Sequence, residues 1–592
     1  MAARPSCWRA STPSSVTDTS TTSLGSEPAT GGSAARGARR LARRWAPAAA
    51  LSVAAGLLVG LPLAVLLRTA LEEGLGPLLE ATASAGPAIW ATIWTSLGAT
   101  ALAVGVGALI ALLTERTDAP GRRGLRLAML VALIVPGYVA ALGWLNAYGP
   151  GGLLDDLFGV AAPALVGPLG IVVVMGVEAA PIAYLIVVAG LHSRAEPDLE
   201  RAARASGASA IDAIRSITMP LLRPVFAGAA AIAFVLSVTS FGVPAVLGIP
   251  AGFTTMTTRI YRDLAFSSDP ASFVRAVGLA IVLAVGAAVI IALADWLLER
   301  RRADRSGVFA GPIGHMGQSA PGPQEEGAGR RRVRPRALAA GAVAWLVVGT
   351  IVIVPLLGLL STALNRAPGL PPGPSSWTLD NFREVLDPRT LEALGNSVVL
   401  AAAAAAGVIA LAALAVMARR GRGVGLTGSL LGLTFALPGS TLAVAVLLAY
   451  GASLRNTLLI ILIAYLAKFW AVGYRPVAAG LDAIPADAYR AARVSGAGAW
   501  TTMRTVVLPA LRPMIVAGGL IVFMFGLHEV TMSSLLYGPG SATLAVVVLN
   551  LQQLGEVGLT AALALVLAGI VTLAALPLLG RTGVLERVGW RR

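Results

Sequence analysis

Two stretches of this sequence read RAARASGASAIDAIRSITMPLLRPVF (residues 201–226) and RAARVSGAGAWTTMRTVVLPALRPMI (residues 490–515). At a constant offset of 289 residues, 13 of the 26 aligned positions are identical. A shared preference for Ala and Gly does not explain the match, because it would not place Arg-Ala-Ala-Arg, Ser-Gly-Ala and Arg-Pro at one offset. The chain is therefore built from two related halves.

The composition indicates a membrane protein rather than a soluble enzyme. Of the 592 residues, 56% are hydrophobic and 13% are charged, whereas a soluble chain has roughly 25% charged residues. With this apolar content, the net charge of +16 suits anionic lipid or cytoplasmic loops better than nucleic acid. One cysteine, three histidines and a single lysine outside any P-loop argue against a disulfide framework, a metal site and an ATPase site. We expect this chain itself to bind no cofactor.

Apolar runs recur at the length of about 20 residues that a membrane-spanning helix needs. Each half holds six of them, and Pro-Gly occurs in the third run of each half, at Pro136-Gly137 and Pro438-Gly439. The twelve runs lie at about 46–67, 88–113, 124–147, 168–191, 224–247, 273–297, 338–362, 395–418, 425–450, 456–480, 513–536 and 558–580. The sequence therefore predicts an all-α integral membrane protein with about twelve transmembrane helices.

Arginine is distributed unevenly between the loops, and this predicts the orientation. Cytoplasmic loops are enriched in Arg and Lys, and the segments 69–87, 148–167 and 537–557 contain neither. Two outer loops break the contrast through Arg259, Arg262, Arg383 and Arg389. The pattern still favours twelve spans with both termini in the cytoplasm. Arginine in place of lysine and a high Ala and Gly content suggest a GC-rich bacterial genome, so the expected location is a bacterial inner membrane.

These observations predict a domain organisation with two parallel repeats. Six spans return the chain to the side where it began, so both halves have the same orientation, related by a pseudo-twofold axis along the membrane normal. The predicted parts are a disordered N-terminal tail (1–45), a first half (46–302), a cytoplasmic linker (303–337), a second half (338–581) and a C-terminal tail (582–592).

The repeated stretch is predicted to lie in a cytoplasmic loop of each half. Leu199 to Ile214 is rich in alanine and predicts a short helix that Gly207 interrupts. Pro220 and Pro224 then predict a turn into the next span. Such a helix would present small side chains to a soluble partner.

The spacing of these residues resembles the coupling-loop motif of binding-protein-dependent ABC importer permeases. That family usually has Glu before the paired alanines, where this chain has Arg201 and Arg490. The matching residues are Ala202, Ala203, Gly207, Ile217, Met219 and Pro220, and again Ala491, Ala492, Gly496, Val506, Leu508 and Pro509.

The resemblance implies a type I ABC importer permease with its two halves fused. It implies two copies of an ABC ATPase subunit, which carry ATP and Mg²⁺, docked at the two loops on the cytoplasmic side. It also implies an extracytoplasmic solute-binding protein that delivers the cargo. Segments after the loops, among them residues 241–248 and 528–530, are similar to fused ferric-iron importer permeases. Permeases for thiamine, polyamines and phosphonates share the architecture and stay as alternatives.

Polar residues in the fifth and eleventh runs are candidates for the translocation path. Ionisable groups at membrane depth are costly and usually face a pathway or a partner helix. Glu529 favours the path, although hydrogen bonds between helices would explain the same pattern. The six candidates are Ser237, Thr239, Ser240, His528, Glu529 and Thr531.

Two other classes of protein compete with the permease. An ion-gradient-driven secondary transporter would place acidic residues in several spans, where Glu529 is nearly alone, and would not explain the twin loops. A membrane-embedded enzyme would need a cluster of His, Asp and Glu at catalytic spacing, and we find none in the sequence.

Overall fold

The computed structural model describes residues 46–194, 197–303, 335–419 and 437–581. The predicted tails lie outside these ranges, as does nearly all of the predicted linker. Within the described ranges the backbone forms helices and loops, and one isolated β-bridge joins Asn365 to Trp377. The predicted all-α class is confirmed.

The helices of the first half follow the order of the apolar runs. They are α2 (Leu61–Glu73), α3 (Leu75–Ser84), α4 (Gly86–Arg116), α5 (Arg122–Ile134), α6 (Gly137–Tyr148), α7 (Leu153–Phe158), α8 (Pro168–Arg194), α9 (Pro197–Ala205), α10 (Ala210–Ala213), α11 (Met219–Val238), α12 (Gly242–Leu247), α13 (Met256–Ala265) and α14 (Pro270–Ala303).

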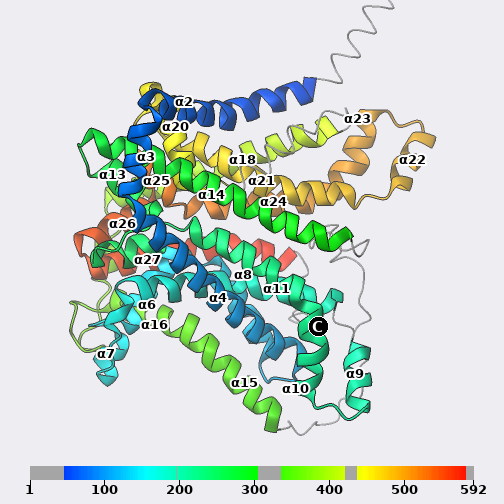
Figure 1. The fold of residues 1–592 in the computed structure, drawn as a ribbon, viewed down its shortest axis with the longest axis horizontal. Helices are drawn as coiled ribbons and strands as arrows, with labels where there is room; N and C mark the ends of the chain where they lie inside the picture. Colours follow the sequence, from blue (N-terminus) through cyan, green and yellow to red (C-terminus); the bar gives the residue numbers. More distant parts are fainter. Residues whose placement is uncertain (1–45, 195–196, 304–334, 420–436, 582–592) are drawn as a thin grey trace, which may run out of the picture. The chain divides into compact units, whose positions relative to one another are not determined.

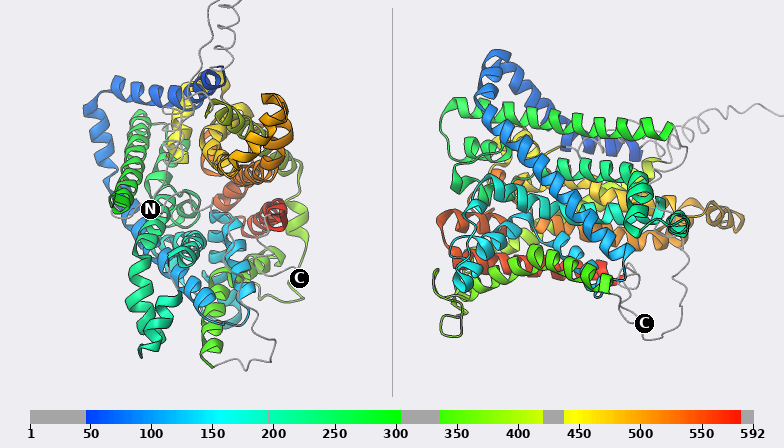
Figure 2. Two further views of the ribbon diagram at one scale, coloured as in Figure 1. Left: turned by 90° about the vertical axis from the view of Figure 1, so that its right-hand side faces the viewer. Right: turned by 60° about the horizontal axis from the view of Figure 1, so that its bottom comes forward.

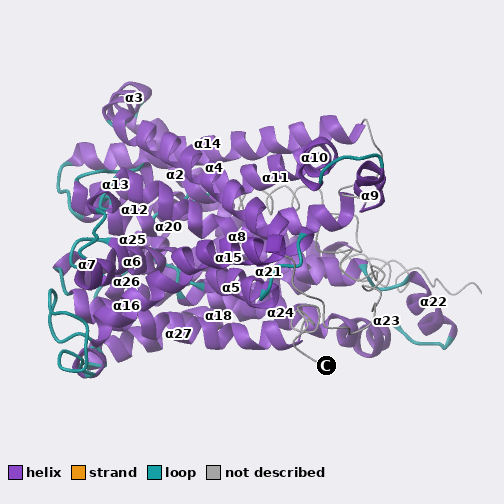
Figure 3. Cartoon of the chain, turned by 90° about the horizontal axis from the view of Figure 1, so that it is seen from below, coloured by secondary structure: helices purple, strands orange, loops and turns teal. Residues whose placement is uncertain are grey.

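The second half repeats this order. Its helices are α15 (Pro335–Val348), α16 (Val354–Leu364), α17 (Asp380–Glu384), α18 (Pro388–Arg419), α20 (Gly439–Leu454), α21 (Leu458–Asp482), α22 (Ala486–Val494), α23 (Ala499–Thr502), α24 (Leu508–Leu527), α25 (Thr531–Leu536), α26 (Leu544–Leu554) and α27 (Val557–Arg581). The axes of the long helices of both halves are roughly aligned with one another (Figure 3).

Ten helices in the described ranges are long and apolar enough to cross a membrane. The third predicted span is broken, because α5 and the segment Gly137–Phe158 meet at an angle of 111°. The ninth predicted run begins among residues outside the described ranges and continues as the apolar helix α20. The structure therefore agrees with a multi-pass architecture.

Two predicted spans are displaced from their expected positions. The helices that correspond to the fifth and eleventh predicted spans cover Ile214–Val238 and Trp500–Leu527 rather than 224–247 and 513–536. The predicted turn at Pro220 is wrong, since this proline lies in a continuous helix. A π-helical turn, η3 (Ile214–Thr218), precedes Pro220, and an equivalent turn, η6 (Met503–Val507), precedes the corresponding proline. These turns take up the hydrogen-bond mismatch that a proline creates in a helix.

The first span of each half packs against the other half. The helix α2 lies beside α20, and α15 and α16 lie beside α5 and α6 (Figure 1). Leu51, Ala55 and Val59 are buried in one cluster with side chains of the second half. Ala344 and Val348 are buried in turn among side chains of the first half. The halves are interlocked, and Figure 2 shows the exchange from two further directions.

Two tyrosines hydrogen-bond across this exchange. Each first span contains a π-helical turn, η1 (Gly56–Gly60) or η5 (Gly349–Ile353). The Tyr450 hydroxyl donates to the Leu57 carbonyl oxygen at 2.6 Å, and the Tyr148 hydroxyl donates to the Thr350 carbonyl oxygen at 2.7 Å. A backbone carbonyl at such a turn needs a donor from a neighbouring helix when water is excluded.

Small residues let the exchanged helices approach closely. A Cβ added to Gly358 of α16 would lie 2.6 Å from the Cα of Ala147 in α6. Lipid tails are as apolar as the helix surfaces, so packing at close range stabilises helix association in a membrane. Residues of both halves accordingly share the largest buried cluster, which includes Leu142 and Leu359.

Candidate functional site

Both repeated stretches lie at one end of the helix bundle, which we call the coupling-motif end. It holds α9, α10, α22 and α23, whereas α7, α13 and α26 lie at the opposite end (Figures 1 and 3). Each stretch forms a helix, a tight turn and a second helix that continues into a long span. The first helix ends at Ala205, so the predicted interruption by Gly207 is confirmed.

The motif glycines make both turns possible. Gly207 and Gly496 have φ angles of +95° and +74°, a left-handed conformation that costs other residues about 1–2 kcal/mol. The N–H of Ala208 donates to the carbonyl oxygen of Ala203 at 3.0 Å, and the equivalent bond in the second loop is 2.9 Å long. This bond is typical of a Schellman helix end. A Cβ at either glycine would meet nothing within 4 Å, so the backbone conformation, and not space, requires glycine.

Both motif loops carry exposed apolar side chains besides the paired alanines. Leu199 of the first loop is 45% exposed, and Val494 and Trp500 of the second loop are 89% and 76% exposed. Ala202 and Ala491 are exposed, and the alanine after each is half-buried. Exposed apolar surface of this kind is typical of a protein–protein contact.

The first loop is tied to the bundle by Glu200 of α9. Its Oε1 accepts a hydrogen bond from the Thr218 hydroxyl at 2.5 Å and forms an ion pair with Arg116 Nη2 at 3.1 Å. Thr218 is fully buried, and the side chains of Arg116 and Glu200 are 16% and 17% exposed. One carboxylate therefore joins the motif helix to α4 and to the π-helical turn η3.

The second loop is tied to the bundle differently. At the offset of 289, Tyr489 replaces Glu200, and it packs against a cluster that contains Val477, Val507 and Leu511. Arg490 pairs with Asp487 at 3.0 Å on the surface. The two loops therefore share their turns but differ in their anchors.

Both spans that follow the loops end at a break in the helix. The helix α11 stops at Val238 and α24 stops at Leu527, and a short helix follows each break. Thr239 and Ser240 lie in the first break, and His528 and Glu529 lie in the second. The two other candidates adjoin the breaks, Ser237 at the end of α11 and Thr531 at the start of α25.

Glu529 accepts hydrogen bonds at the start of the short helix α25. Its carboxylate oxygens accept the N–H of Met532 at 3.0 and 2.9 Å and the N–H of Ser533 at 3.1 Å. Ser533 is also bonded to the hydroxyl of the buried Tyr465 at 2.7 Å. The carboxylate thus has a structural role, because it accepts the free N–H groups in the first turn of α25.

Sequence reasoning did not pair two charged residues, Glu178 of α8 and Lys468 of α21, which lie at the starts of α6 and α20. A Cβ on Gly137 would collide with the Glu178 carboxylate, so this carboxylate lies directly at the start of α6. Lys468 Nζ donates to the carbonyl oxygen of Leu437, beside Pro438, at 2.5 Å. When the fourth span of each half is aligned at an offset of 290 residues, Glu178 stands opposite Lys468. This alignment of the sequence could have shown that the two residues occupy equivalent positions.

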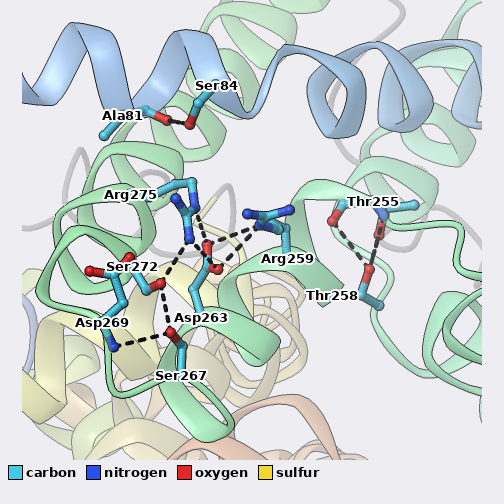
Figure 4. Close-up of polar contacts among 10 residues, drawn as sticks. All are labelled: Ala81, Ser84, Thr255, Thr258, Arg259, Asp263, Ser267, Asp269, Ser272 and Arg275. Atoms are coloured by element: carbon cyan, nitrogen blue, oxygen red, sulfur yellow. Dashed lines mark hydrogen bonds and ion pairs between the residues drawn. The ribbon is translucent and has the colours of Figure 1, made fainter.

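At the opposite end of the bundle, two of the arginines that break the loop pattern pair with acidic side chains. The carboxylate of Asp263, 6% exposed, accepts two bonds from Arg275 at 2.8 and 2.9 Å (Figure 4). Arg259 Nε lies 3.2 Å from the same carboxylate. In the second half, Arg383 pairs with Asp380 at 3.3 Å. Arg259 and Arg383 therefore each have an acidic partner, which Arg259 shares with Arg275.

The sequence matches the family described as "Binding-protein-dependent transport system inner membrane component" over residues 56–303 and 407–582. These segments cover most of the chain, and each contains one of the repeated loops. The chain belongs to this family. It is a transport permease that crosses the membrane several times and whose two family segments are fused in one polypeptide.

Individual relatives of the permease carry different names. A protein named as the 2-aminoethylphosphonate transport system permease PhnV of Salmonella typhi is 30% identical over 243 residues, which cover 40% of this chain and 91% of that protein. The thiamine transport system permease protein ThiP of Brucella abortus is 30% identical over 185 residues, 30% of this chain and 34% of that protein.

The structure shows roles for two glutamates, Glu178 and Glu200, that the motifs did not indicate. Glu178 is a second acidic residue at a helix break, so the expectation that Glu529 is nearly alone among acidic residues in the spans needs correction. Glu200 lies one residue before Arg201 and is anchored inward, to Thr218 and Arg116. Arg201 and Arg490, at the usual glutamate positions, are exposed.

Proposed function

We propose that this chain is the translocation subunit of an ABC importer and supplies both of its transmembrane halves. The observation that carries the proposal is the pair of loops at the coupling-motif end, each built on a left-handed glycine and each continuous with a span that reaches a helix break. A force on such a loop reaches the break through one helix. The chain supplies no ATP-hydrolysing site of its own in this scheme.

Two ATPase subunits dock at these loops, one at each. The exposed alanines and the apolar side chains of Leu199, Val494 and Trp500 support a contact with another protein. ATP and Mg²⁺ bind to those partners. The coupling-motif end then faces the bacterial cytoplasm, with both termini on that side, and a solute-binding protein delivers cargo at the opposite end.

Co-purification of the ATPase with the permease tests the docking. The double substitution Gly207→Trp and Gly496→Trp should abolish co-purification, because it strains both turns and blocks both surfaces. The matched control is Gly159→Trp with Gly252→Trp, since these glycines also have positive φ and open space but lie at the opposite end. ATPase retention by the first variant, or equal loss in the control, would contradict the proposal.

We also propose that the helix breaks line the translocation path. Support comes from buried polar atoms in the described region that have no hydrogen-bond partner, among them Ser237 Oγ, His528 Nδ1 and Tyr138 Oη. Such groups are costly in an apolar interior and are expected where water or cargo passes. The Glu178 and Glu529 carboxylates at two of the breaks fit the same path.

Charge-neutral variants separate a role in the path from a structural role. Glu529→Gln keeps an oxygen that can accept the Met532 and Ser533 N–H groups, and Glu178→Gln keeps the side-chain volume. We expect normal assembly with at least tenfold slower uptake, since an ionisable group at membrane depth is costly unless used. Unchanged uptake by both variants would remove these residues from the path.

Ferric iron delivered by a binding protein is the cargo that we propose from the resemblance of the segments after the loops. A phosphonate is the second candidate, because the PhnV relative aligns over nearly its whole length. Thiamine is named for the shorter ThiP match, and polyamines remain an alternative. Binding of ferric ion, 2-aminoethylphosphonate, thiamine and spermidine to the purified solute-binding protein decides among them. Tight binding of another cargo only would overturn the iron proposal.

A further inference from the structure

The span α4 ends at the coupling-motif end in two charged residues, Glu115 and Arg116. Adjacent residues on a helix point in different directions around its axis, so the two side chains reach different neighbours. Arg116 Nη2 pairs with Glu200 of the motif helix α9 at 3.1 Å. Glu115 Oε1 pairs with Arg126 Nη2 of α5 at 2.7 Å, and Glu115 Oε2 lies 3.1 Å from His192 Nε2 of α8. We call these five residues the α4 clamp.

The ion pairs at the centre of the α4 clamp are shielded from water. The side chain of Glu115 is 8% exposed, and Arg116 and Arg126 are half-buried. Salt screens such pairs weakly, and removing one partner leaves the other charge buried and uncompensated. The pair of Glu115 with Arg126 therefore fixes the start of α5 against the end of α4.

Apolar contacts join the same helix ends beneath the clamp. Ile110 of α4, Leu125 of α5 and Leu191 of α8 are buried in one cluster. Apolar contacts have no preferred direction, and packed helices can slide past one another over them by small amounts. Ion pairs with short distances oppose that sliding. We therefore assign the common movement of these helix ends to the clamp rather than to the apolar cluster.

Two of the clamped helices meet again at the break of the third span. The helix α5 ends at Ile134, directly before Pro136 and Gly137. The helix α8 carries Glu178, whose carboxylate lies at the start of α6. A continuous helix thus joins the clamp to each side of the break, and a displacement of the clamp reaches both sides.

The sequence of the second half does not supply these charges at the corresponding positions. Residues 415–424, which include the end of α18, read AVMARRGRGV and contain no Asp or Glu. At the position of Glu200 the second loop has Tyr489, which is uncharged at neutral pH. The clamp is therefore specific to the first half.

We propose, given the ATPase docking proposed for this loop, that the α4 clamp makes the first loop move the break at Gly137. When the ATPase moves α9, Glu200 displaces Arg116 and with it the end of α4. Glu115 and Arg126 are positioning residues that carry α5 along. The second loop acts through its own span α24, so the two loops make different contributions to one movement.

Distances between spin labels in the complex with the ATPase test the proposal. Labels are placed in a Cys7→Ser background, because this chain has one cysteine. The first pair, Ser206→Cys with Ser495→Cys, reports the distance between the loops, since both serines are exposed at equivalent positions. The second pair, Arg122→Cys with Ser495→Cys, reports the position of α5. In lipid nanodiscs with a non-hydrolysable ATP analogue and Mg²⁺, the first distance should shorten and the second should shift with it.

Variants of the ion pair separate the clamp from the loop movement. Arg126→Gln should leave the shift of the first label pair intact and remove most of the shift of the second, because α5 is released from Glu115. Arg126→Lys keeps the charge and should restore the second shift. The matched control, Arg123→Gln, changes an exposed arginine on the same helix and should retain both shifts. Glu115→Gln breaks the same pair from the other side and serves if Arg126→Gln does not assemble.

Three results would overturn the proposal. If the first label pair shifts and the second does not in the chain with an intact clamp, the loop moves without α5, and the ATPase docking stands. If Arg126→Gln or Glu115→Gln assembles and keeps the second shift, the ion pair does not carry the movement. If the first label pair does not shift, the clamp has no movement to pass on, and the docking proposal fails with it.

Discussion

Replacing Glu200 by alanine should release the first coupling loop from the bundle while leaving the second in place. The substitution removes the acceptor of the Thr218 hydroxyl and one partner of Arg116. Thr218 is fully buried, and a buried polar group without its partner costs about 1–3 kcal/mol. We take about 2 kcal/mol as the loss of local stability in α9, which corresponds to about thirtyfold faster amide exchange.

Hydrogen exchange with mass spectrometry on the intact chain in nanodiscs measures this directly. Peptides that cover α9 should exchange faster in Glu200→Ala, and those that cover α22 should not change. Glu200→Gln should have a smaller effect, because its amide oxygen still accepts from Thr218.

The matched control is Asp487→Ala in the second loop. Its ion pair with Arg490 is largely exposed, with side chains 71% and 85% exposed, so its loss should change exchange by less than about threefold. Equal protection of α9 in Glu200→Ala and wild type would refute the anchoring role of this carboxylate.

Three further predictions concern the stability of the fold. Tyr148→Phe and Tyr450→Phe should each destabilise the fold by about 1 kcal/mol through loss of a bond between halves, and the double variant by their sum, as measured by thermal unfolding in detergent. If neither variant lowers the melting temperature, these bonds do not hold the exchange. Gly358→Val should cost about 1–3 kcal/mol in the same assay, because its Cβ would meet the opposing helix, and wild-type stability would contradict that close approach. Hydrogen bonds from the Thr390 side chain and backbone lower the pKa of Asp387. The ionised carboxylate therefore stabilises the folded state at pH values above its ordinary pKa of about 3.9. This contribution is lost as the pH falls through the lowered pKa. Asp387→Ala should therefore reduce stability by about 1 kcal/mol at pH 7, and this difference from wild type should vanish in strong acid; a difference that persists there would contradict the capping role.

Several features of the site followed from local sequence. Gly207 and Gly496 recur at one offset within short helical patterns, and a glycine after such a pattern is typical of a left-handed helix end. The apolar runs predicted most of the long helices, because membrane length and the lack of water require about 20 apolar residues in a row. The spans near Pro220 and Pro509 were misplaced because π-helical turns allow a helix to continue through a proline, and no composition signal marks such turns.

The sequence by itself determined that this is a duplicated, multi-pass transport protein, because repeats, hydropathy and motif spacing are properties of the chain read in order. Only the tertiary structure decided that each first span packs on the opposite half, that Glu200 reaches Thr218 and Arg116, and that Glu115 joins α4 to α5 and α8. These contacts join separate segments of the chain, so they depend on how the helices pack against one another, and small residues such as Gly358 let the helices approach closely.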